Sequence, residues 1–180
     1  MTRIEKNTIE QAKRFFKNIK NIVIITHFNP DGDAIGSSLG LYHYLTHENY
    51  DVSVIIPNSS PKFLHWLPGN ENIQVYEDNQ IQCETLIESA ELIVYLDFNV
   101  LDRTQGMEKF LRSLKKPKIL IDHHPDPEDF ADITISNVKV SSTSELLYEF
   151  ILNLGGEEKI DKTTAECLYT GIMTDTGSFS

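Results

Sequence analysis

The sequence contains few cysteines and no long hydrophobic run. Its two cysteines, Cys83 and Cys167, lie far apart without CxxC spacing, which argues against a zinc ribbon or a disulfide framework and indicates reduced thiols. The longest apolar stretches, such as IVII and LIVYL, are too short to span a bilayer, and the first residues have no apolar signal segment. We therefore expect a soluble cytoplasmic protein with no membrane partner.

Positive charge is also scarce. The chain has 16 Lys and Arg against 27 Asp and Glu, which gives a formal net charge of −11. Such a field repels polyanions, so a long duplex nucleic acid is not an expected partner. A small anionic substrate is still a candidate if bound cations supply local positive charge.

The length and the composition suit one folded domain over residues 1–180. The chain is 40% hydrophobic and 24% charged, as in ordinary globular proteins, and it has no internal repeat or flexible linker. Apolar runs typical of buried strands alternate with helical patterns, which predicts an α/β fold with an open, mostly parallel sheet flanked by helices. We expect strands at 21–26, 51–56, 92–97, 118–122 and, as a short edge strand, 132–136. We expect helices at 4–20, 34–47, 81–89, 104–115, 142–153 and 162–173, with a loop-rich stretch from 57 to 79.

Three of the predicted strands end in residues of the types that commonly bind metals. The last helix also ends in such a residue. Because ligands bind outside the carboxyl ends of parallel strands, we expect these side chains to meet at one edge of the sheet. They are His27, Asp31, Asp33, Asp97, Asp122, His123, His124 and Asp175. Imidazole and carboxylate together suit manganese or a similar divalent ion, and a carboxylate can bridge two metals that share an attacking hydroxide. The amide groups that open the helix at 34–37 are a further candidate site for a phosphate oxygen.

Each of these features has a simpler interpretation when taken alone. The segment PDGD is typical of a turn, paired histidines are often incidental, and Asp97 and Asp175 could only end a strand and a helix. An EF-hand is excluded because the twelfth position from Asp31 is Tyr42 rather than Glu. The metal-site interpretation is favoured because all these potential ligands are predicted to lie at the same edge of the sheet.

Four segments, in order along the chain, resemble the signature segments of the DHH phosphoesterase superfamily. They are HFNPDGDAIGS, VYLDFNVLDR, LIDHHPDPEDFAD and TGIMTDTGSF. The sequence is most similar to the nanoRNase/pAp phosphatase branch, which includes exopolyphosphatase-related proteins, and fits family II pyrophosphatases and RecJ nucleases less well. Members of this branch continue into a DHH-associated domain that grips the substrate. The resemblance therefore implies that this chain, which stops at Ser180, is a catalytic domain cut before that second domain.

The resemblance also implies roles for individual residues. His27 and Asp31 would hold one ion, Asp33, His123 and Asp175 would hold a second, and Asp97 would bridge the two. Asp97 and His124 would be the catalytic residues, with His124 facing the scissile phosphate and Asp122 orienting a histidine. The substrate contacts would include His124, Arg103 and Ser37, although a structural salt bridge is an equally good interpretation of Arg103.

The function expected from this resemblance is a two-metal phosphoesterase that uses a metal-activated hydroxide on short nucleotidic phosphoesters. These are short oligoribonucleotides, 3′-phosphoadenosine 5′-phosphate or linear dinucleotides. The ions are expected to be manganese, with magnesium as the alternative. Two other functions stay open, namely a pyrophosphatase or exopolyphosphatase and a non-catalytic module that binds nucleotide or metal. The oligomeric state is also open, with a homodimer as one alternative.

Overall fold

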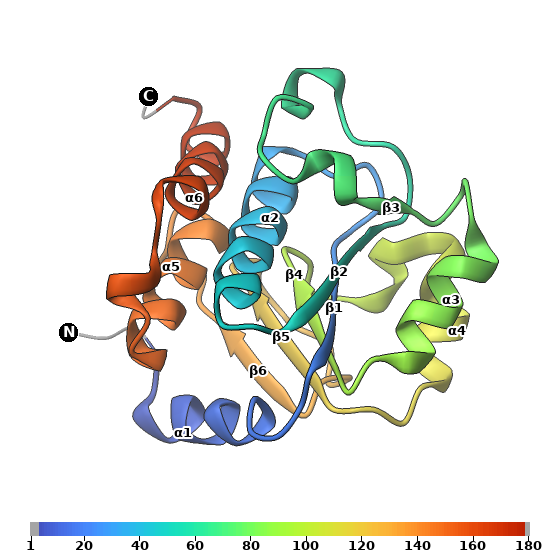
Figure 1. Ribbon diagram of the computed structural model, residues 1–180, viewed down its shortest axis with the longest axis horizontal. Helices are drawn as coiled ribbons and strands as arrows, with labels where there is room; N and C mark the ends of the chain where they lie inside the picture. Colours follow the sequence, from blue (N-terminus) through green and yellow to red (C-terminus); the bar gives the residue numbers. More distant parts are fainter. Residues whose placement is uncertain (1–3, 179–180) are drawn as a thin grey trace.

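The computed structural model describes residues 4–178, which form a three-layer α/β arrangement (Figure 1). Within these residues, six strands form one sheet in the order β3-β2-β1-β4-β5-β6, and every neighbouring pair is parallel. The strands are β1 (Asn21–Ile25), β2 (Asp51–Ile56), β3 (Gln74–Val75), β4 (Leu92–Leu96), β5 (Lys118–Asp122) and β6 (Ile133–Ser136). The predicted open parallel sheet is confirmed.

Six α-helices cover the two faces of this sheet. They are α1 (Lys6–Phe15), α2 (Gly32–His47), α3 (Gln80–Ser89), α4 (Glu108–Ser113), α5 (Thr143–Leu154) and α6 (Lys162–Asp175). One apolar cluster joins α1, α2, α5 and α6 to one face of the sheet, and a second joins α3 and α4 to the other face (Figure 1). Because side chains alternate across a strand, each central strand supplies both clusters. This explains the nearly continuous apolar runs in its sequence.

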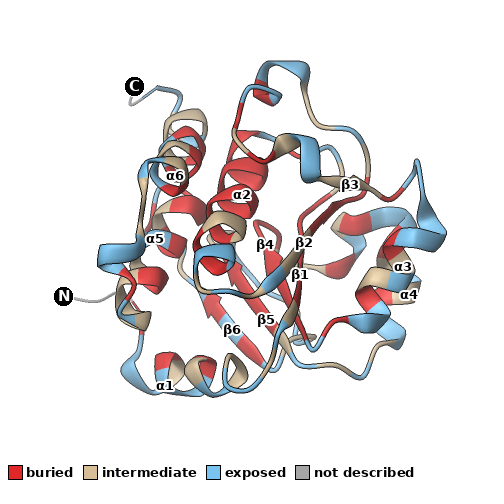
Figure 2. Ribbon diagram, in the orientation of Figure 1, coloured by how far each residue is buried: buried red, intermediate tan, exposed pale blue. Residues whose placement is uncertain are grey.

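Burial along the strands follows their position in the sheet (Figure 2). All five residues of β4 are buried, as a central strand covered on both faces requires. In β6 buried and exposed residues alternate, so Ile133 and Ile135 face the core while Thr134 and Ser136 face outward. The prediction of a short edge strand at this position is therefore correct.

The structure differs from the predicted elements in three places. The first helix ends at Phe15 rather than residue 20, ahead of Asn18, which adopts a left-handed backbone with φ 60°. The helix predicted at 104–115 is a 3-10 segment, Leu101–Met107, followed by the short α4, because Gln105 has non-helical angles (φ 46°, ψ −109°). The stretch predicted as loop contains β3, whose two residues pair with the end of β2.

Glycines allow α2 and α6 to pack closely beside the candidate site. An added Cβ on Gly36 would lie 2.7 Å from the backbone oxygen of Cys167 and from the backbone nitrogen of Gly171. One on Gly32 would lie 2.3 Å from the Thr174 hydroxyl oxygen. This close approach sets α6, which carries Asp175, against the helix that begins after Asp31. Within residues 4–178 no helix is both long enough and apolar enough to cross a membrane.

Candidate metal centre

The predicted site residues lie at the carboxyl ends of three adjacent strands. His27 follows β1, Asp97 follows β4, and Asp122 is the last residue of β5. The chain runs from β1 outward through β2 to β3, and then returns to continue from β4 through β5 to β6. The point between β1 and β4 is therefore the topological switch point of the sheet. Ligands bind at this position in open α/β sheets.

One ring nitrogen of His27 is hydrogen-bonded to the backbone, and the other has no hydrogen-bond partner among the described residues. Its Nδ1 donates to the carbonyl of Phe28 at 2.9 Å, which leaves the lone pair on Nε2. Nε2 is buried and has no hydrogen-bond partner within residues 4–178. Burial is the largest influence on its pKa and lowers it, so the neutral ring is favoured. A neutral ring with an unpartnered buried nitrogen is the form that binds a divalent cation.

Asp31 caps the helix that follows it. Its Oδ1 accepts the backbone N–H groups of Asp33 and Ala34, both at 3.0 Å, and these contacts fix the carboxylate at the start of α2. The expectation that these opening amides bind a phosphate oxygen is therefore wrong for Ala34, whose N–H already has a partner. The Ser37 hydroxyl is fully buried and donates to the Asp33 carbonyl at 2.7 Å, so the structure adds no support for its predicted contact with a substrate.

Asp97 lies between two histidines in a strained conformation. Its φ is 67°, in the left-handed region that non-glycine residues seldom adopt, and its exposed fraction is 1%. Its Oδ2 lies 3.6 Å from His27 Nε2, and its Oδ1 lies 3.7 Å from His123 Nε2. Burial, and next the charge of Asp33, raise its pKa well above the ordinary value. A carboxylate held in this way needs a positive partner to stay ionised.

Asp33 is buried among amides of the first turn of α5. Thr143 N donates to Oδ2 at 2.6 Å and Ser144 N donates to Oδ1 at 2.9 Å. The Thr143 hydroxyl donates to Asp97 Oδ1 at 2.8 Å. Burial raises the pKa of Asp33, and the hydrogen bonds that Asp33 accepts from Ser144 and Thr143 oppose the shift. No motif in the sequence points to Thr143 or Ser144 as site residues, and the pattern at 142–153 predicts only that a helix begins there.

His123 and Asp175 complete the group from the opposite side. His123 Nε2 lies 3.5 Å from Asp175 Oδ2, so the end of α6 reaches the end of β5. Potential ligand atoms within 4.8 Å of one another form three overlapping groups. Two of them, which we call the two triads, are His27, Asp31 and Asp97, and Asp33, His123 and Asp175. The third is Asp97, His123 and His124. The structure thus brings all six predicted metal ligands together.

His124 is oriented by Asp122. Its Nδ1 donates to Asp122 Oδ1 at 2.7 Å, and this hydrogen bond is the main reason that the pKa of His124 is raised. The same nitrogen lies 3.9 Å from Asp97 Oδ1, which places the ring beside the six potential ligands. The predicted contact between Asp122 and one of the paired histidines is therefore present in the structure.

Arg103 lies near these residues and acts on two of them through its charge. Its carbonyl accepts the Phe28 N–H at 2.8 Å, and its positive charge contributes to lowering the pKa of both His27 and His124. No ion pair within residues 4–178 involves its guanidinium, so the alternative of a structural salt bridge is not supported there. Its charge stays available to an anion.

The donor set fits divalent cations. Two atoms that each bind one ion at about 2.1 Å are separated by roughly 3 Å, slightly less than the 3.5–3.7 Å between the paired atoms here. Nitrogen and carboxylate oxygen without thiolate match manganese or a similar ion. His27 Nε2, a buried acceptor without a donor, is the polar atom that such an ion would satisfy.

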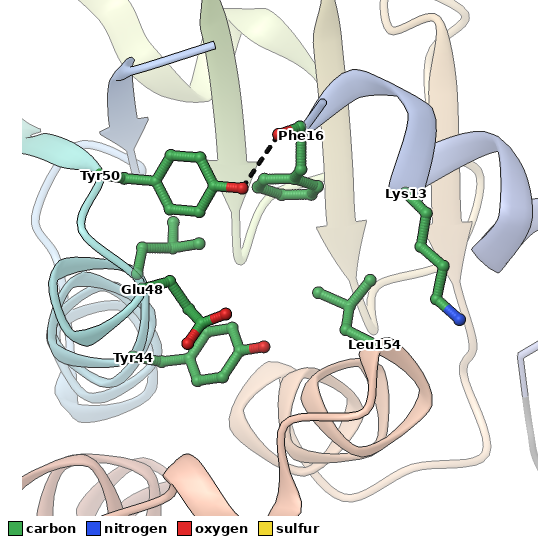
Figure 3. Close-up of a pocket in the computed structure, with 7 residues that line it drawn as sticks. Lys13, Phe16, Tyr44, Glu48, Tyr50 and Leu154 are labelled. Carbon is green, nitrogen blue, oxygen red and sulfur yellow. Dashed lines mark hydrogen bonds between the residues drawn. The ribbon is translucent and has the colours of Figure 1, made fainter. Parts of the chain in front are cut away.

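A separate cavity of about 130 Å³ lies between the C-terminal parts of α1, α2 and α5 (Figure 3). It is lined by Lys13, Phe16, Tyr44, Leu45, Glu48, Tyr50 and Leu154. The Tyr50 hydroxyl closes one wall by donating to the Phe16 carbonyl at 2.9 Å. None of the predicted site residues lines this cavity.

The sequence is similar to those of several named proteins. A bifunctional oligoribonuclease and PAP phosphatase NrnA from Thermus thermophilus is 36% identical over 88% of this chain and 44% of its own length. A probable NrnA from Streptococcus mutans is 30% identical over 91% of this chain. The chain spans about half the length of these curated relatives, 48% and 44%.

A solved structure resembles the whole chain. An exopolyphosphatase-related protein from Bacteroides fragilis superposes with a TM-score of 0.98 and 46% identity, over all of this chain and 53% of that one. RecJ from Thermus thermophilus in complex with Mn²⁺ shares the fold, with a TM-score of 0.60 over 96% of this chain and 24% of that one, at 12% identity. The family model described as the DHH family, N-terminal domain, matches residues 21–172. The chain belongs to the DHH family.

Proposed function

We propose that this protein is a metal-dependent phosphoesterase that hydrolyses short nucleotidic phosphoesters. Candidate substrates are short oligoribonucleotides, 3′-phosphoadenosine 5′-phosphate and linear dinucleotides. The observation that carries the proposal is the position of Asp97, whose two oxygens face His27 and His123, one in each triad. A carboxylate in this position suits a bridge between two cations.

Each residue of the centre has a proposed role. His27, Asp31 and Asp97 Oδ2 would hold one ion, and Asp33, His123, Asp175 and Asp97 Oδ1 would hold the other. Two such ions, when bound, lower the pKa of a water molecule and neutralise charge on a phosphate. We propose manganese because of the donor set, and because a RecJ of the same fold is described in complex with Mn²⁺.

His124 and Arg103 would act on the substrate rather than on the ions. The hydrogen bond to Asp122 occupies His124 Nδ1 and favours the protonated ring, which can donate to a phosphate oxygen or to the leaving oxygen. The guanidinium of Arg103 would bind a phosphate oxygen as a charged donor. Because the net charge is −11, these local charges would be needed to attract an anion.

The relatives support this choice of substrates. The NrnA proteins are named for oligoribonuclease and PAP phosphatase activity, and they match 91% and 88% of this chain. The B. fragilis protein is described as exopolyphosphatase-related, which keeps phosphoanhydride hydrolysis as the second candidate. A module that binds nucleotide or metal without turnover is the third.

A substrate panel separates these functions. The complete gene product would be incubated with Mn²⁺ or Mg²⁺ and a dinucleotide, 3′-phosphoadenosine 5′-phosphate, pyrophosphate or polyphosphate. We expect release of mononucleotide or of phosphate from the first two, loss of this activity in Asp97→Asn, and normal activity in Asp51→Asn. Asp51 is the exposed first residue of β2, at the end of the strands opposite to the ligands, so it controls for the change in charge.

Turnover of pyrophosphate or polyphosphate alone would replace the proposal with the second candidate. Binding of metal and nucleotide without turnover of any substrate would favour the third.

A further inference from the structure

The first turn of α5 contacts two of the proposed metal ligands. The Thr143 hydroxyl donates to Asp97 Oδ1 at 2.8 Å, and Thr143 N and Ser144 N donate to the two oxygens of Asp33 at 2.6 and 2.9 Å. All four residues are buried, with Thr143 and Ser144 fully buried and the two aspartates 1% exposed. Hydrogen bonds to a charged acceptor in such surroundings are strong and fix the orientation of the carboxylate.

These contacts are not needed to form α5. The helix is capped by Ser142, whose Oγ accepts the N–H of Glu145 at 3.0 Å, while Glu145 reaches back to the N–H of Ser141 at 2.7 Å. The Thr143 hydroxyl takes no part in this cap. It donates its hydrogen bond to the carboxylate of Asp97, which lies 46 positions earlier in the sequence.

Both contacts affect the same half of the centre. Asp97 Oδ1, which accepts from Thr143, is the oxygen near His123, whereas Oδ2 faces His27. Asp33 belongs to the triad with His123 and Asp175. Asp31, in the other triad, is oriented by the amides of α2 instead. The two triads are therefore supported by different helices.

The α6 helix closes the same half. A Cβ added to Gly171 would lie 2.8 Å from Asp33 Oδ1 and 2.0 Å from the Ser144 hydroxyl oxygen. Asp33 is thus confined between the first turn of α5 and the backbone of α6. This packing leaves the carboxylate little room to turn away from its observed orientation.

We propose that Thr143 is a positioning residue for one of two metal positions, the one formed by Asp33, His123, Asp175 and Asp97 Oδ1. Its hydroxyl holds Asp97 Oδ1 in place for that ion, while the amides of Thr143 and Ser144 hold Asp33. The His27 position does not depend on this hydroxyl. The inference rests on the proposed two-metal centre. It adds that a substitution at Thr143 can change the metal affinity of one position without changing that of the other.

The test measures the binding of Mn²⁺ to the complete gene product by titration calorimetry and by electron paramagnetic resonance. We expect two classes of site in the wild type. Thr143→Val keeps the shape of the side chain but removes the donor. Because outer partners of metal ligands are worth about 10–100-fold in affinity, we expect one class to weaken by that factor and the other to change less than about twofold. Thr143→Ser restores the donor and should bind both ions as the wild type does.

Thr104→Val is the matched control. Thr104 is also fully buried, and its hydroxyl donates to the Leu101 carbonyl at 2.7 Å, so the same change removes a buried hydrogen bond that touches no carboxylate. We expect it to leave both classes of Mn²⁺ site unchanged. Thermal unfolding of each variant shows that the protein is folded before binding is compared.

The possible results separate the two proposals. Equal weakening of both classes in Thr143→Val, no weakening of either, or failure of Thr143→Ser to restore binding would overturn the role of Thr143. A wild-type protein that binds no Mn²⁺ would instead overturn the proposed metal-dependent function.

Discussion

Nε2 of His27 and Oδ2 of Asp97 face each other at 3.6 Å in the buried interior, and no hydrogen bond joins them. The ring nitrogen is an acceptor because its other nitrogen donates to Phe28. The carboxylate is also an acceptor, so two acceptors share a space that contains no donor from the described residues. This relationship favours a cation between them, since unpartnered buried acceptors destabilise a fold.

Asp97→Asn should have opposite effects on stability without and with metal. In the presence of a chelator we expect the variant to melt higher than the wild type, because it removes a buried charge next to Asp33. A gain of about 1 kcal/mol corresponds to roughly 2–4 °C for a chain of this length. With excess Mn²⁺ the order should reverse, since ligand binding stabilises the wild type by mass action.

Differential scanning calorimetry under both conditions measures this reversal. Asparagine tolerates the left-handed backbone of position 97, so the change does not add strain there. If the variant melts below the wild type in chelator, the buried charge is not a source of instability and this account is wrong.

Gly36→Ala should destabilise the packing of α2 on α6. The new Cβ would lie 2.7 Å from backbone atoms of Cys167 and Gly171, which cannot move as a flexible side chain can. We expect a loss of about 1–3 kcal/mol in the free energy of unfolding, measured by denaturant titration. Gly106→Ala is the control, because nothing lies within 4 Å of its added Cβ. Similar losses in both variants would indicate a general effect of replacing glycine.

Asp122→Asn should impair turnover more than metal binding. Asp122 raises the pKa of His124 mainly through their hydrogen bond and also through its negative charge. The variant removes the charge and weakens the hydrogen bond, so the pKa of His124 should fall. We expect kcat to fall by about tenfold or more, since a positioned proton donor contributes about 10²–10⁴-fold. The affinity for Mn²⁺ should change little. A variant that loses Mn²⁺ binding and turnover together would show that Asp122 supports the metal ligands instead.

Acid should weaken the contact between Glu128 and Arg112. Hydrogen bonds from the Arg112 guanidinium are the main reason that the pKa of Glu128 lies below its ordinary value of 4.5. Because this folded-state pKa is lowered, the stabilising contribution is present above about pH 4.5 and is lost as the pH falls through the lowered value. Glu128 also accepts the N–H of Leu101 at 3.1 Å, which ties the contact to the segment that carries Arg103.

Thermal unfolding between pH 6 and pH 3 tests this contact. The stability of Glu128→Gln should depend less steeply on pH below 4.5 than that of the wild type. Identical slopes in the two proteins would show that the ion pair contributes nothing in acid.

Much of the sheet could be predicted from local pattern. The strands at 51–56 and 118–122 have the predicted bounds, because short runs of β-branched residues between polar turns specify buried parallel strands. The two-residue β3 could not be predicted, since its pairing with the end of β2 is set by tertiary structure. The break at Gln105 was missed for a similar reason, because the helical periodicity continues across it.

The potential metal ligands could also be predicted from the sequence, but the contacts that orient them could not. The spacing of His27, Asp31 and Asp33 after a strand, together with Asp97 and His123 after others, indicated which side chains would meet. The substrate contact of Ser37 stays a prediction, because a serine near the start of a helix can face a ligand or bond back to its own helix, as its hydroxyl does here to Asp33.

The sequence by itself determined which strands end in potential ligands and that the donors are nitrogen and oxygen, because residue type and strand pattern are local properties. Only the tertiary structure decided that Thr143 and Ser144 would orient Asp33, since these contacts join positions 110 and 111 residues apart. It also decided that the two oxygens of Asp97 would face different histidines. The physical reason is that burial and helix packing, which no short segment specifies, fix the direction of each carboxylate.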